Sequence, residues 1–357
     1  GTVRESATAF SQPEVAFLPA QQRPSDMAGP TRWGIVGSGR ISHDFVVCLH
    51  SMSPDKHKVV AVAGKNYENA KRFRDLHGIN LAYSTYEELA SDPDVDVAYV
   101  GVLHPDHYAT ACMLLEGGKH VLCEKPLTSC RRDTESLCEL ARDKGLFLME
   151  ALWTRFVPAY RRMLDELEQN AVGVPRYMHV TVGYPMHGLE RVFRRDLGGS
   201  VVLTMGTYCA NLALQVLGPE LPLRITARGD FNSEGVDTVV AGTMEFNGGR
   251  LATFAMSSVF HMPSIAEIVG TKGIITLGPP SASPPGLETP SGRVDLPFPP
   301  VSMPLNYEFS SGLRYEAEEV RSCLIRGLKE STLMPHKDSV LIASMLDEIL
   351  LQLHRIL

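Results

Sequence analysis

Apolar residues in the first 150 positions fall into short runs, separated by segments with helical periodicity. Strands are predicted at residues 32–36, 59–63, 96–102, 121–123 and 146–149, and helices at 67–77, 85–89, 109–116 and 131–144. The runs are apolar at consecutive positions, as in strands that are buried on both faces of a parallel sheet. Thr85 and Glu88 have the spacing of a capping box, which marks a helix start. Because strand and helix alternate, the pattern predicts a doubly wound, parallel α/β sheet.

The pattern changes after residue 156. One amphipathic helix is predicted at 158–170, followed by short strands at 176–184, 223–231, 238–246, 250–257, 265–269 and 273–277. Apolar and polar residues alternate along these strands, which predicts an antiparallel sheet with one open face. The segment 279–300 is rich in Pro, Gly and Ser and should form a loop with at most one edge strand. Further helices are predicted at 210–217, 315–326 and 337–357.

These patterns divide the chain into two domains and a tail. A Rossmann domain is predicted at 27–150 and a mainly antiparallel α+β domain at 151–336, with a final helix, 337–357, that packs back on the first domain. Residues 1–26 are rich in Ser, Thr, Gln and Pro and are predicted to form a disordered tail. Their longest apolar run is too short for a secretory signal, and Met27 resembles a native start.

Composition narrows the class of protein. At 357 residues, the chain is long enough for two domains. Its net charge of −7 argues against a general binder of nucleic acid or of anionic membranes. No apolar run approaches the roughly 20 residues that would span a bilayer. The cysteines number seven, and several lie in apolar segments like reduced core thiols, so a cytoplasmic protein is expected.

A glycine-rich turn connects the first predicted strand to a helix that runs to residue 48. The sequence Gly37-Ser-Gly-Arg-Ile-Ser42 has the Gly-x-Gly-x-x-small spacing of a dinucleotide fingerprint. The first glycine permits a tight turn, the second lets the backbone approach a pyrophosphate, and the small third residue lets the helix pack on the strand. Free amides at the helix start then bind the phosphates. The predicted cofactor-binding residues of this turn are Gly37, Ser38, Gly39, Arg40 and Ile41.

The residues after the second predicted strand bear on the choice between NAD and NADP. This strand ends in Gly64-Lys65-Asn66, without an acidic residue that would bind the ribose 2′-hydroxyl of NAD, and Lys71 and Arg72 follow nearby. These cations favour NADP, and Lys65 is the predicted contact. The alternative is that they only form the solvated start of a helix, in which case NAD stays open.

Two histidines follow the predicted strand 96–102, where the carboxyl ends of parallel strands bind ligands. His104 and His107 are predicted to contact the nicotinamide or the pyrophosphate, although His107 could equally lie beside a helix N-cap. No metal site is expected, because no further ligands stand at suitable spacing around them.

Glu124 and Lys125 end the next buried run, 121–123, and are also candidates for cofactor contact. Pro126 cannot donate to a sheet ladder, so it stops the strand directly after Lys125. A lysine that is partly desolvated beside a substrate has a lowered pKa and can take part in proton transfer. The alternative is a surface lysine in a strand-exit loop.

Three stretches resemble a known family. Trp33-Gly-Ile-Val-Gly-Ser-Gly-Arg-Ile-Ser42, Gly118-Lys-His-Val-Leu-Cys-Glu-Lys-Pro-Leu127 and Met149-Glu-Ala-Leu-Trp-Thr-Arg-Phe156 are similar to segments of the glucose–fructose oxidoreductase/inositol dehydrogenase (Gfo/Idh/MocA) family. The resemblance implies an NADP-dependent oxidoreductase that acts on a secondary hydroxyl of a cyclic polyol, either a trans-dihydrodiol or an aldopyranose such as D-xylose. It also implies a homodimer formed through the C-terminal sheet.

The resemblance further implies roles for residues of the substrate cleft. Tyr208 matches the general acid/base of the family, and Lys125 would lower its pKa and orient the substrate hydroxyl. Thr204 stands where the family pattern usually has Asp, and would contact substrate without that charge. Trp153 and Arg176 match positions near the cleft. On the residues alone, Trp153 and Tyr208 could be core aromatics, and Arg176 could face solvent.

Thr204 at the Asp position leaves a second class of function open. A regulatory or structural protein that binds NADP(H) on the same fold, with weak catalysis or none, would need neither Lys125 nor Tyr208. Retention of both residues beside an intact glycine turn favours the dehydrogenase.

Overall fold

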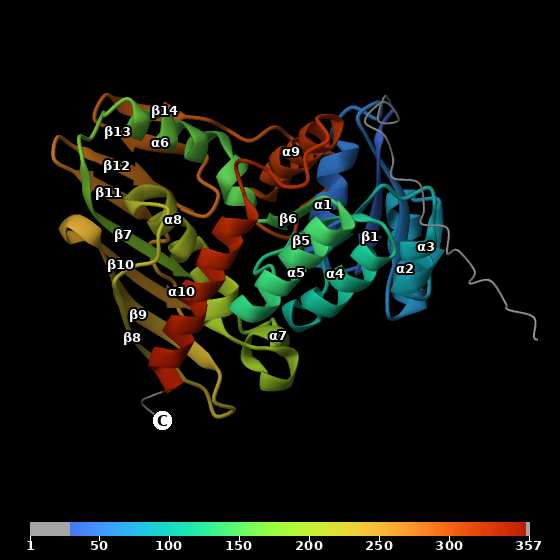
Figure 1. Ribbon diagram of the computed structural model, residues 1–357, viewed down its shortest axis with the longest axis horizontal. Coiled ribbons are helices and arrows are strands. Elements are labelled where there is room, and N and C mark those ends of the chain that lie inside the picture. Colours follow the sequence, from blue (N-terminus) through green and yellow to red (C-terminus); the bar gives the residue numbers. More distant parts are fainter. Residues whose placement is uncertain (1–28, 355–357) are drawn as a thin grey trace, which may run out of the picture.

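Two β-sheets organise the chain, which the computed structural model describes from residue 29 to residue 354 (Figure 1). The first sheet has six parallel strands in the order β3-β2-β1-β4-β5-β6, and the second has eight strands in the order β14-β13-β12-β11-β7-β10-β9-β8. The predicted fold class, a Rossmann sheet followed by a large and mainly antiparallel sheet, is confirmed. The predicted tail, residues 1–26, lies outside the described residues.

The Rossmann half repeats a strand–helix unit. Its strands are β1 (Thr31–Val36), β2 (His57–Ala63), β3 (Leu81–Tyr83), β4 (Val97–Val100), β5 (His120–Glu124) and β6 (Leu148–Ala151). Its helices are α1 (Arg40–His50), α2 (Tyr67–His77), α3 (Tyr86–Ser91), α4 (His107–Glu116) and α5 (Arg131–Lys144), with a 3₁₀ turn, η2, at His104–Asp106. The predicted capping box of Thr85 and Glu88 opens α3. Because strand order reverses between β1 and β4, ligands are expected at the carboxyl ends of these strands.

The second half places helices on one face of the large sheet. Its strands are β7 (Pro175–Gly183), β8 (Arg224–Phe231), β9 (Asp237–Phe246), β10 (Arg250–Ser257), β11 (Ala266–Gly270), β12 (Ile274–Leu277), β13 (Gly286–Thr289) and β14 (Gly292–Asp295). Its helices are α6 (Pro158–Glu168), α7 (Glu190–Phe193), α8 (Thr207–Leu217), α9 (Leu313–Ile325) and α10 (His336–His354). Helical turns lie at η3 (Trp153–Phe156), η4 (Arg195–Leu197), η5 (Val202–Gly206), η6 (Asn247–Gly249) and η7 (Ser310–Gly312).

Two details of the large sheet differ from the sequence-based expectation. Strands β7 and β10 pair in parallel, while the other neighbours in this sheet are antiparallel. The segment 279–300 contains two paired strands, β13 and β14, instead of at most one. Both details depend on pairing between distant segments, which the alternation within one strand does not reveal.

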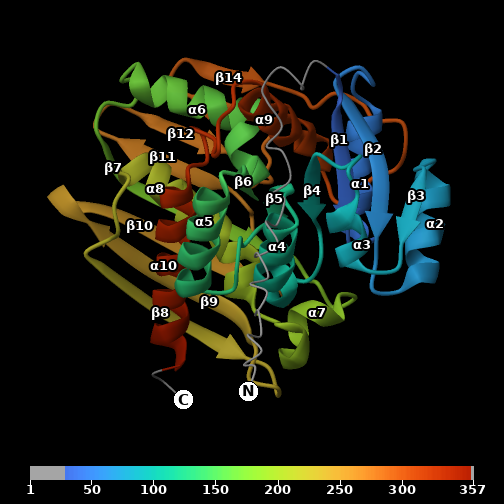
Figure 2. The same cartoon turned by 45° about the vertical axis from the view of Figure 1, so that its right-hand side comes forward.

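Helices α8 and α10 lie between the large sheet and the Rossmann half in both views of the molecule (Figures 1 and 2). One continuous cluster of buried apolar residues includes β1 and α1 of the first half and α8, α10 and the large sheet of the second. Contrary to the expectation from sequence, one helical stretch, Arg195–Leu217, is long and apolar enough to cross a membrane by length and composition. However, 89% of its apolar window is buried inside the protein, as in the core helix of a soluble fold.

A buried arginine ties three segments of the second half together. Arg155, 2% exposed, donates to Oδ1 of Asn211 in α8 at 2.6 Å and to the Leu333 carbonyl at 2.9 Å. It also pairs with Oδ2 of Asp338 in α10 at 2.6 Å. An ion pair of this kind contributes mainly when it is intact, because a lone buried charge is strongly destabilising.

Arg155→Ala is therefore expected to lower the free energy of unfolding by about 3–5 kcal/mol, since it leaves Asp338 without its cation. Urea unfolding followed by circular dichroism measures this loss. Arg132→Ala is the control, because the Arg132 side chain is 89% exposed and its loss should cost less than about 0.5 kcal/mol. Equal unfolding midpoints for the two variants would contradict this account of the buried pair.

Candidate active site

The glycine turn forms a cradle at the carboxyl end of β1. Gly37 has a φ of 95°, and a Cβ there would lie 2.9 Å from the Gly101 carbonyl oxygen, so only glycine fits. Ser42 is fully buried and packs directly against Gly101 at the end of β4, as the small third residue of the fingerprint should. Helix α1 begins after Gly39 with neither a side-chain cap nor an acidic residue in its first turn. The turn therefore fits a dinucleotide pyrophosphate, with backbone amides free to bind it.

Lys65 lies directly after β2, at the position that selects between NAD and NADP. Its ammonium pairs with Oδ2 of Asp106 in η2 at 2.8 Å, and both side chains are exposed. Hydrogen bonding to Asp106 raises the pKa of Lys65, so the lysine carries its charge at neutral pH. Asn66 caps α2 by accepting from the Asn69 amide. The sole charged side chain of the 64–66 segment is thus a cation, which fits a 2′-phosphate. In this structure the cation is paired with the Asp106 carboxylate.

Glu124 is the last residue of β5 and directly precedes the candidate lysine. One of its oxygens accepts a hydrogen bond of 2.7 Å from the hydroxyl of Tyr99 in β4, and the other accepts from the Lys125 backbone amide at 3.2 Å. Burial raises the pKa of Glu124, while these donors and the Lys125 charge act in the opposite direction. Both oxygens are engaged inside the protein, and cofactor contact by Glu124 stays a prediction.

His107 holds the turn after β5. Its ring nitrogens lie 2.8 Å from the Pro126 carbonyl oxygen and 3.2 Å from the Val102 carbonyl oxygen, and the residue is 1% exposed. Both ring nitrogens face backbone carbonyl oxygens, and cofactor contact by His107 stays a prediction. Its neighbour His104 lies against Gly198, where a Cβ would be 2.9 Å from Nε2, and so marks the junction of the two halves.

Lys125 extends from the Glu-Lys-Pro turn toward α8. Its ammonium donates to the Thr204 carbonyl at 2.7 Å and lies 4.7 Å from the centre of the Tyr208 ring. Burial lowers the pKa of Lys125 to about 8, and Arg191 of α7 acts in the same direction, whereas Glu124 opposes it. A lysine with this pKa exchanges a proton readily near neutral pH.

Thr204 reaches this site through its backbone. It lies in the π-helical turn η5, where its hydroxyl donates to the Ser200 carbonyl at 2.6 Å, so the side chain is occupied within its own helix. Its carbonyl accepts from Lys125. π-Helical turns frequently occur at functional sites because they disturb the regular hydrogen-bond ladder. Substrate contact by the Thr204 side chain stays a prediction.

Tyr208 and Trp153 meet beside Lys125. The Trp153 indole donates to the Tyr208 hydroxyl at 3.2 Å, and Tyr208 keeps part of its surface accessible. Burial raises the pKa of Tyr208; the indole opposes this effect, and Glu124 and Glu316 reinforce it. That Lys125 lowers the pKa of Tyr208 stays a prediction. Its ammonium lies over the Tyr208 ring and donates to the Thr204 carbonyl.

Arg176 lies outside this cluster. It is exposed at the start of β7 and donates to the Gly248 carbonyl in η6 at 2.9 Å. Strand β7 approaches Tyr184 at its other end, about 25 Å along an extended chain. Burial raises the pKa of Tyr184, with Tyr208 as a further cause, so it is that end of β7 which lies near the cluster. Arg176 faces solvent, as one of the two expectations had it, and substrate contact by Arg176 stays a prediction.

A buried aspartate, which the sequence reasoning missed, connects the cradle to the second half. Asp44 of α1 is fully buried and accepts from the Asn306 amide at 2.8 Å, the Tyr307 amide at 3.0 Å and the Ser310 hydroxyl at 2.6 Å. The Arg40 guanidinium, one turn earlier, lies 5.1 Å from the centre of the Tyr307 ring. The segment 306–310 is thus fastened beside the cradle. An aspartate within an apolar helix was the available signal.

Two further charged residues were missed. Arg191 of the short helix α7 is close enough to lower the pKa of Lys125. Glu316 of α9 is fully buried, and burial and Glu124 raise its pKa well above the ordinary value. Its signal was an acidic residue within the apolar stripe of α9. For Arg191 the sequence contains no comparable signal, because only the fold brings α7 to the sheet edge.

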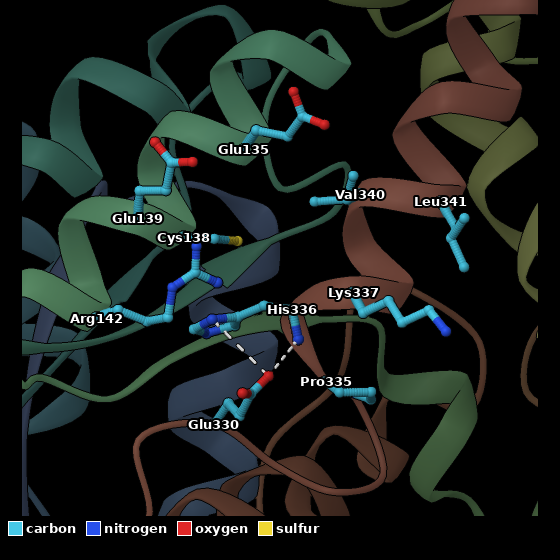
Figure 3. A pocket seen from close by; sticks show the side chains of 10 residues that line it. All are labelled: Glu135, Cys138, Glu139, Arg142, Glu330, Pro335, His336, Lys337, Val340 and Leu341. Carbon is cyan, nitrogen blue, oxygen red and sulfur yellow. Dashed lines mark hydrogen bonds and ion pairs between the residues drawn. The ribbon is translucent and has the colours of Figure 1, made fainter.

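A hollow of about 440 Å³ lies elsewhere, between α5 and the start of α10 (Figure 3). It is lined by Glu135, Cys138, Glu139, Arg142, Glu330, Pro335, His336, Lys337, Val340 and Leu341. His336 bonds through Nε2 to the Leu148 carbonyl at 2.9 Å, which attaches α10 to β6. The hollow contains no residue of the glycine turn or of the Lys125 cluster, so it belongs to the packing of α10 on the Rossmann half.

Solved structures with related folds cover most of the chain. A 3-ketoreductase from Actinomadura kijaniata, in complex with NADP and TDP-benzene, superposes with a TM-score of 0.76 at 24% identity, over 91% of this chain and 98% of that one. Levoglucosan dehydrogenase, in complex with NADH and levoglucosan, superposes with a TM-score of 0.79 at 18% identity, over 91% and 98% of the two chains. At these identities the likeness is one of fold.

Relatives found by sequence share a higher identity with this chain than these solved structures do. The trans-1,2-dihydrobenzene-1,2-diol dehydrogenase of Xenopus laevis is 41% identical over 90% of this chain and 98% of its own length. The enzyme of that name from Homo sapiens is 37% identical over 89% and 95%. A family model described as "Oxidoreductase family, NAD-binding Rossmann fold" matches residues 31–152, and a "GFO/IDH/MocA C-terminal domain" matches residues 160–276. The chain therefore belongs to the Gfo/Idh/MocA family of oxidoreductases, with an NAD(P)-binding Rossmann domain in its first half.

Proposed function

We propose that the protein is an NADP-dependent dehydrogenase that oxidises a secondary hydroxyl of a cyclic polyol, either a trans-dihydrodiol or an aldopyranose such as D-xylose. The observation that carries this proposal is the Lys125–Tyr208–Trp153 cluster, at the carboxyl end of the sheet that contains the dinucleotide cradle. Dihydrodiol dehydrogenases among the sequence relatives support the substrate class. A non-catalytic binder would need no lysine with a lowered pKa in that position.

We assign proton exchange to Lys125. A neutral lysine accepts the proton of the substrate hydroxyl during oxidation, and its pKa of about 8 lets it return that proton to solvent. The Tyr208 hydroxyl already accepts from Trp153, so its own proton is free to donate to the substrate oxygen and orient it. The Trp153 ring supplies an apolar wall for a cyclic substrate. A nicotinamide bound in the cradle would accept the hydride that leaves the carbinol carbon.

Lys125→Met should abolish turnover but leave the dissociation constant of NADPH within a few-fold, because the cradle and Lys65 bind most of the cofactor. In the wild type, kcat/KM for oxidation should rise with pH through about 8, as Lys125 loses its proton. Tyr208→Phe should lower kcat by about 10²–10³-fold, yet its kcat/KM should still rise with pH through about 8. Reduction of NADP⁺ with a panel of aldopyranoses and dihydrodiols measures both.

Lys58→Met is the matched control, because Lys58 is an exposed lysine of β2. It should retain wild-type turnover. Near-wild-type activity of Lys125→Met would overturn the assignment of proton exchange to Lys125. Disappearance of the rise of kcat/KM near pH 8 in Tyr208→Phe would also overturn it, because the titrating group would then be Tyr208.

Lys65→Gln should weaken NADPH binding by about tenfold and leave NADH binding unchanged, because only NADPH has a 2′-phosphate for this cation. Fluorescence titration with each reduced cofactor measures the two dissociation constants. Lys144→Gln, which removes an exposed lysine at the end of α5, should change neither. An equal loss for both cofactors would show that Lys65 does not read the 2′-phosphate.

We also propose that the protein is a homodimer formed through the large sheet. The face of the sheet opposite α8 and α10 has no helix over it in the described chain (Figure 2). Small and hydroxyl side chains lie on that face, with Ala241 opposite Ala255 and Thr243 opposite Thr253. The small side chains at these positions leave room for close packing against a second copy.

Ala241→Arg is expected to convert a dimer into a monomer, because the long cation would be buried without a partner between two closely packed sheets. Light scattering coupled to gel filtration should give twice the chain mass of 39.2 kDa for the wild type and a single chain mass for the variant. Ala241→Ser is the control and should stay dimeric. A monomeric wild type at all concentrations would refute the dimer.

A further inference from the structure

An ion pair joins the two loops that flank the glycine turn. In the sheet order β2-β1-β4, strand β1 lies between β2 and β4, and the glycine turn follows β1. Lys65 follows β2, Asp106 lies in η2 after β4, and Nζ of Lys65 lies 2.8 Å from Oδ2 of Asp106. Because neighbouring strands are about 4.8 Å apart, the pair connects loops whose strands are separated by roughly 10 Å.

Both loops also contact the glycine turn. A Cβ on Gly64, directly before Lys65, would lie 3.5 Å from the Ser38 hydroxyl oxygen. On the other side, a Cβ on Gly37 would lie 3.0 Å from Cγ1 of Val102, two residues after β4. The ion pair therefore lies at the rim of the cradle, beside the end of β2, where the adenosine ribose of a dinucleotide is selected.

The Asp106 carboxylate has Lys65 as its sole hydrogen-bond partner among residues 29–354. Asp106 directly precedes α4, where an aspartate commonly accepts a hydrogen bond from a helix amide, yet its side chain makes no such bond. The Lys65 side chain is 68% exposed and that of Asp106 is 44% exposed. An ion pair this exposed is weak, so another anion can displace the carboxylate.

We propose that Asp106 is a specificity-determining residue, which competes with the 2′-phosphate of NADP(H) for Lys65 and so lowers the preference of the protein for NADP(H) over NAD(H). The carboxylate and the phosphate are both anions, and they repel each other when one ammonium has to serve both. NAD(H) has a hydroxyl at this position and leaves the ion pair intact. This inference rests on the proposed function, because it takes Lys65 as the contact of the 2′-phosphate.

Asp106→Asn should lower the dissociation constant of NADPH by about three- to fivefold, because a neutral amide releases Lys65 from an exposed ion pair. The dissociation constant of NADH should change by less than about twofold. Fluorescence titration with each reduced cofactor measures both constants without turnover. Salt screens exposed charges, so the gain for NADPH should shrink at about 0.5 M NaCl. An unchanged or raised constant for NADPH, or an equal gain for NADH, would overturn the inference.

A double-mutant cycle shows whether Asp106 acts through Lys65. In the Lys65→Gln background, Asp106→Asn should change the dissociation constant of NADPH by less than about twofold, because no ammonium is left to compete for. A gain as large as in the wild-type background would overturn the competition, since Asp106 would then act on the cofactor by repulsion alone. Asp106 is exposed and caps no helix, so the variant should fold like the wild type.

Asp75→Asn is the matched control, because Asp75 is an exposed aspartate in α2 that pairs with Arg74 at 2.7 Å. It should change neither dissociation constant. If Lys65→Gln weakens the binding of both cofactors equally, Lys65 does not contact the 2′-phosphate, and that part of the proposed function fails together with the inference. If Lys65→Gln is selective for NADPH but Asp106→Asn brings no gain, the proposed function stands and the inference alone is overturned.

Discussion

Placing an ammonium group where little water reaches it is the constraint on which this site depends. Desolvation makes the charged form of Lys125 unfavourable and brings its pKa to about 8. The charge is stabilised by the Thr204 carbonyl and the face of the Tyr208 ring, and the Coulombic effect of Glu124 raises the pKa of Lys125 against burial. A cation over an aromatic face is stabilised more strongly when both are desolvated. The lysine is thus held near the midpoint of its titration.

Thr204 and Tyr208 come from the helical stretch Arg195–Leu217 of the second half, whereas Glu124 and Lys125 belong to the Rossmann half, so the site exists only when the two halves are assembled. His107 bonds the Pro126 carbonyl and so holds the turn that follows Lys125. Thr204, in a π-helical turn of the second half, accepts a hydrogen bond from the Lys125 ammonium through its carbonyl. Asp44 fastens the segment 306–310 beside the dinucleotide cradle. Arg155 connects α8 and α10 by bonding to Asn211 and Asp338. Contacts that take no part in the chemistry therefore determine the geometry of the cluster.

Features that depend on local sequence could be predicted, whereas features that depend on contacts between distant segments could not. The glycine turn and the capping box of Thr85 depend on neighbouring residues, and the parallel sheet follows from the alternation of strands and helices; the structure contains all three. The parallel pairing of β7 with β10 and the β13–β14 hairpin join distant or weakly patterned segments, which periodicity does not resolve.

The electrostatics of the site could not be predicted for the same reason. Burial raises the pKa of Tyr208 and lowers that of Lys125, and burial is a property of the assembled fold. The family resemblance implied that the lysine would activate the phenol, and the structure places its ammonium over the ring. Glu316 was hidden because an acidic residue in a helix is usually exposed.

The most direct test of this account is the titration of Lys125 itself. Selective ¹³C labelling of the lysine side chains, with Lys125→Met used to assign the resonance, gives its pKa by NMR without any need for turnover. The account predicts a midpoint about two units below that of an exposed lysine, near pH 8. A midpoint close to that of the exposed lysines would show that the ammonium is solvated, and would contradict the central claim.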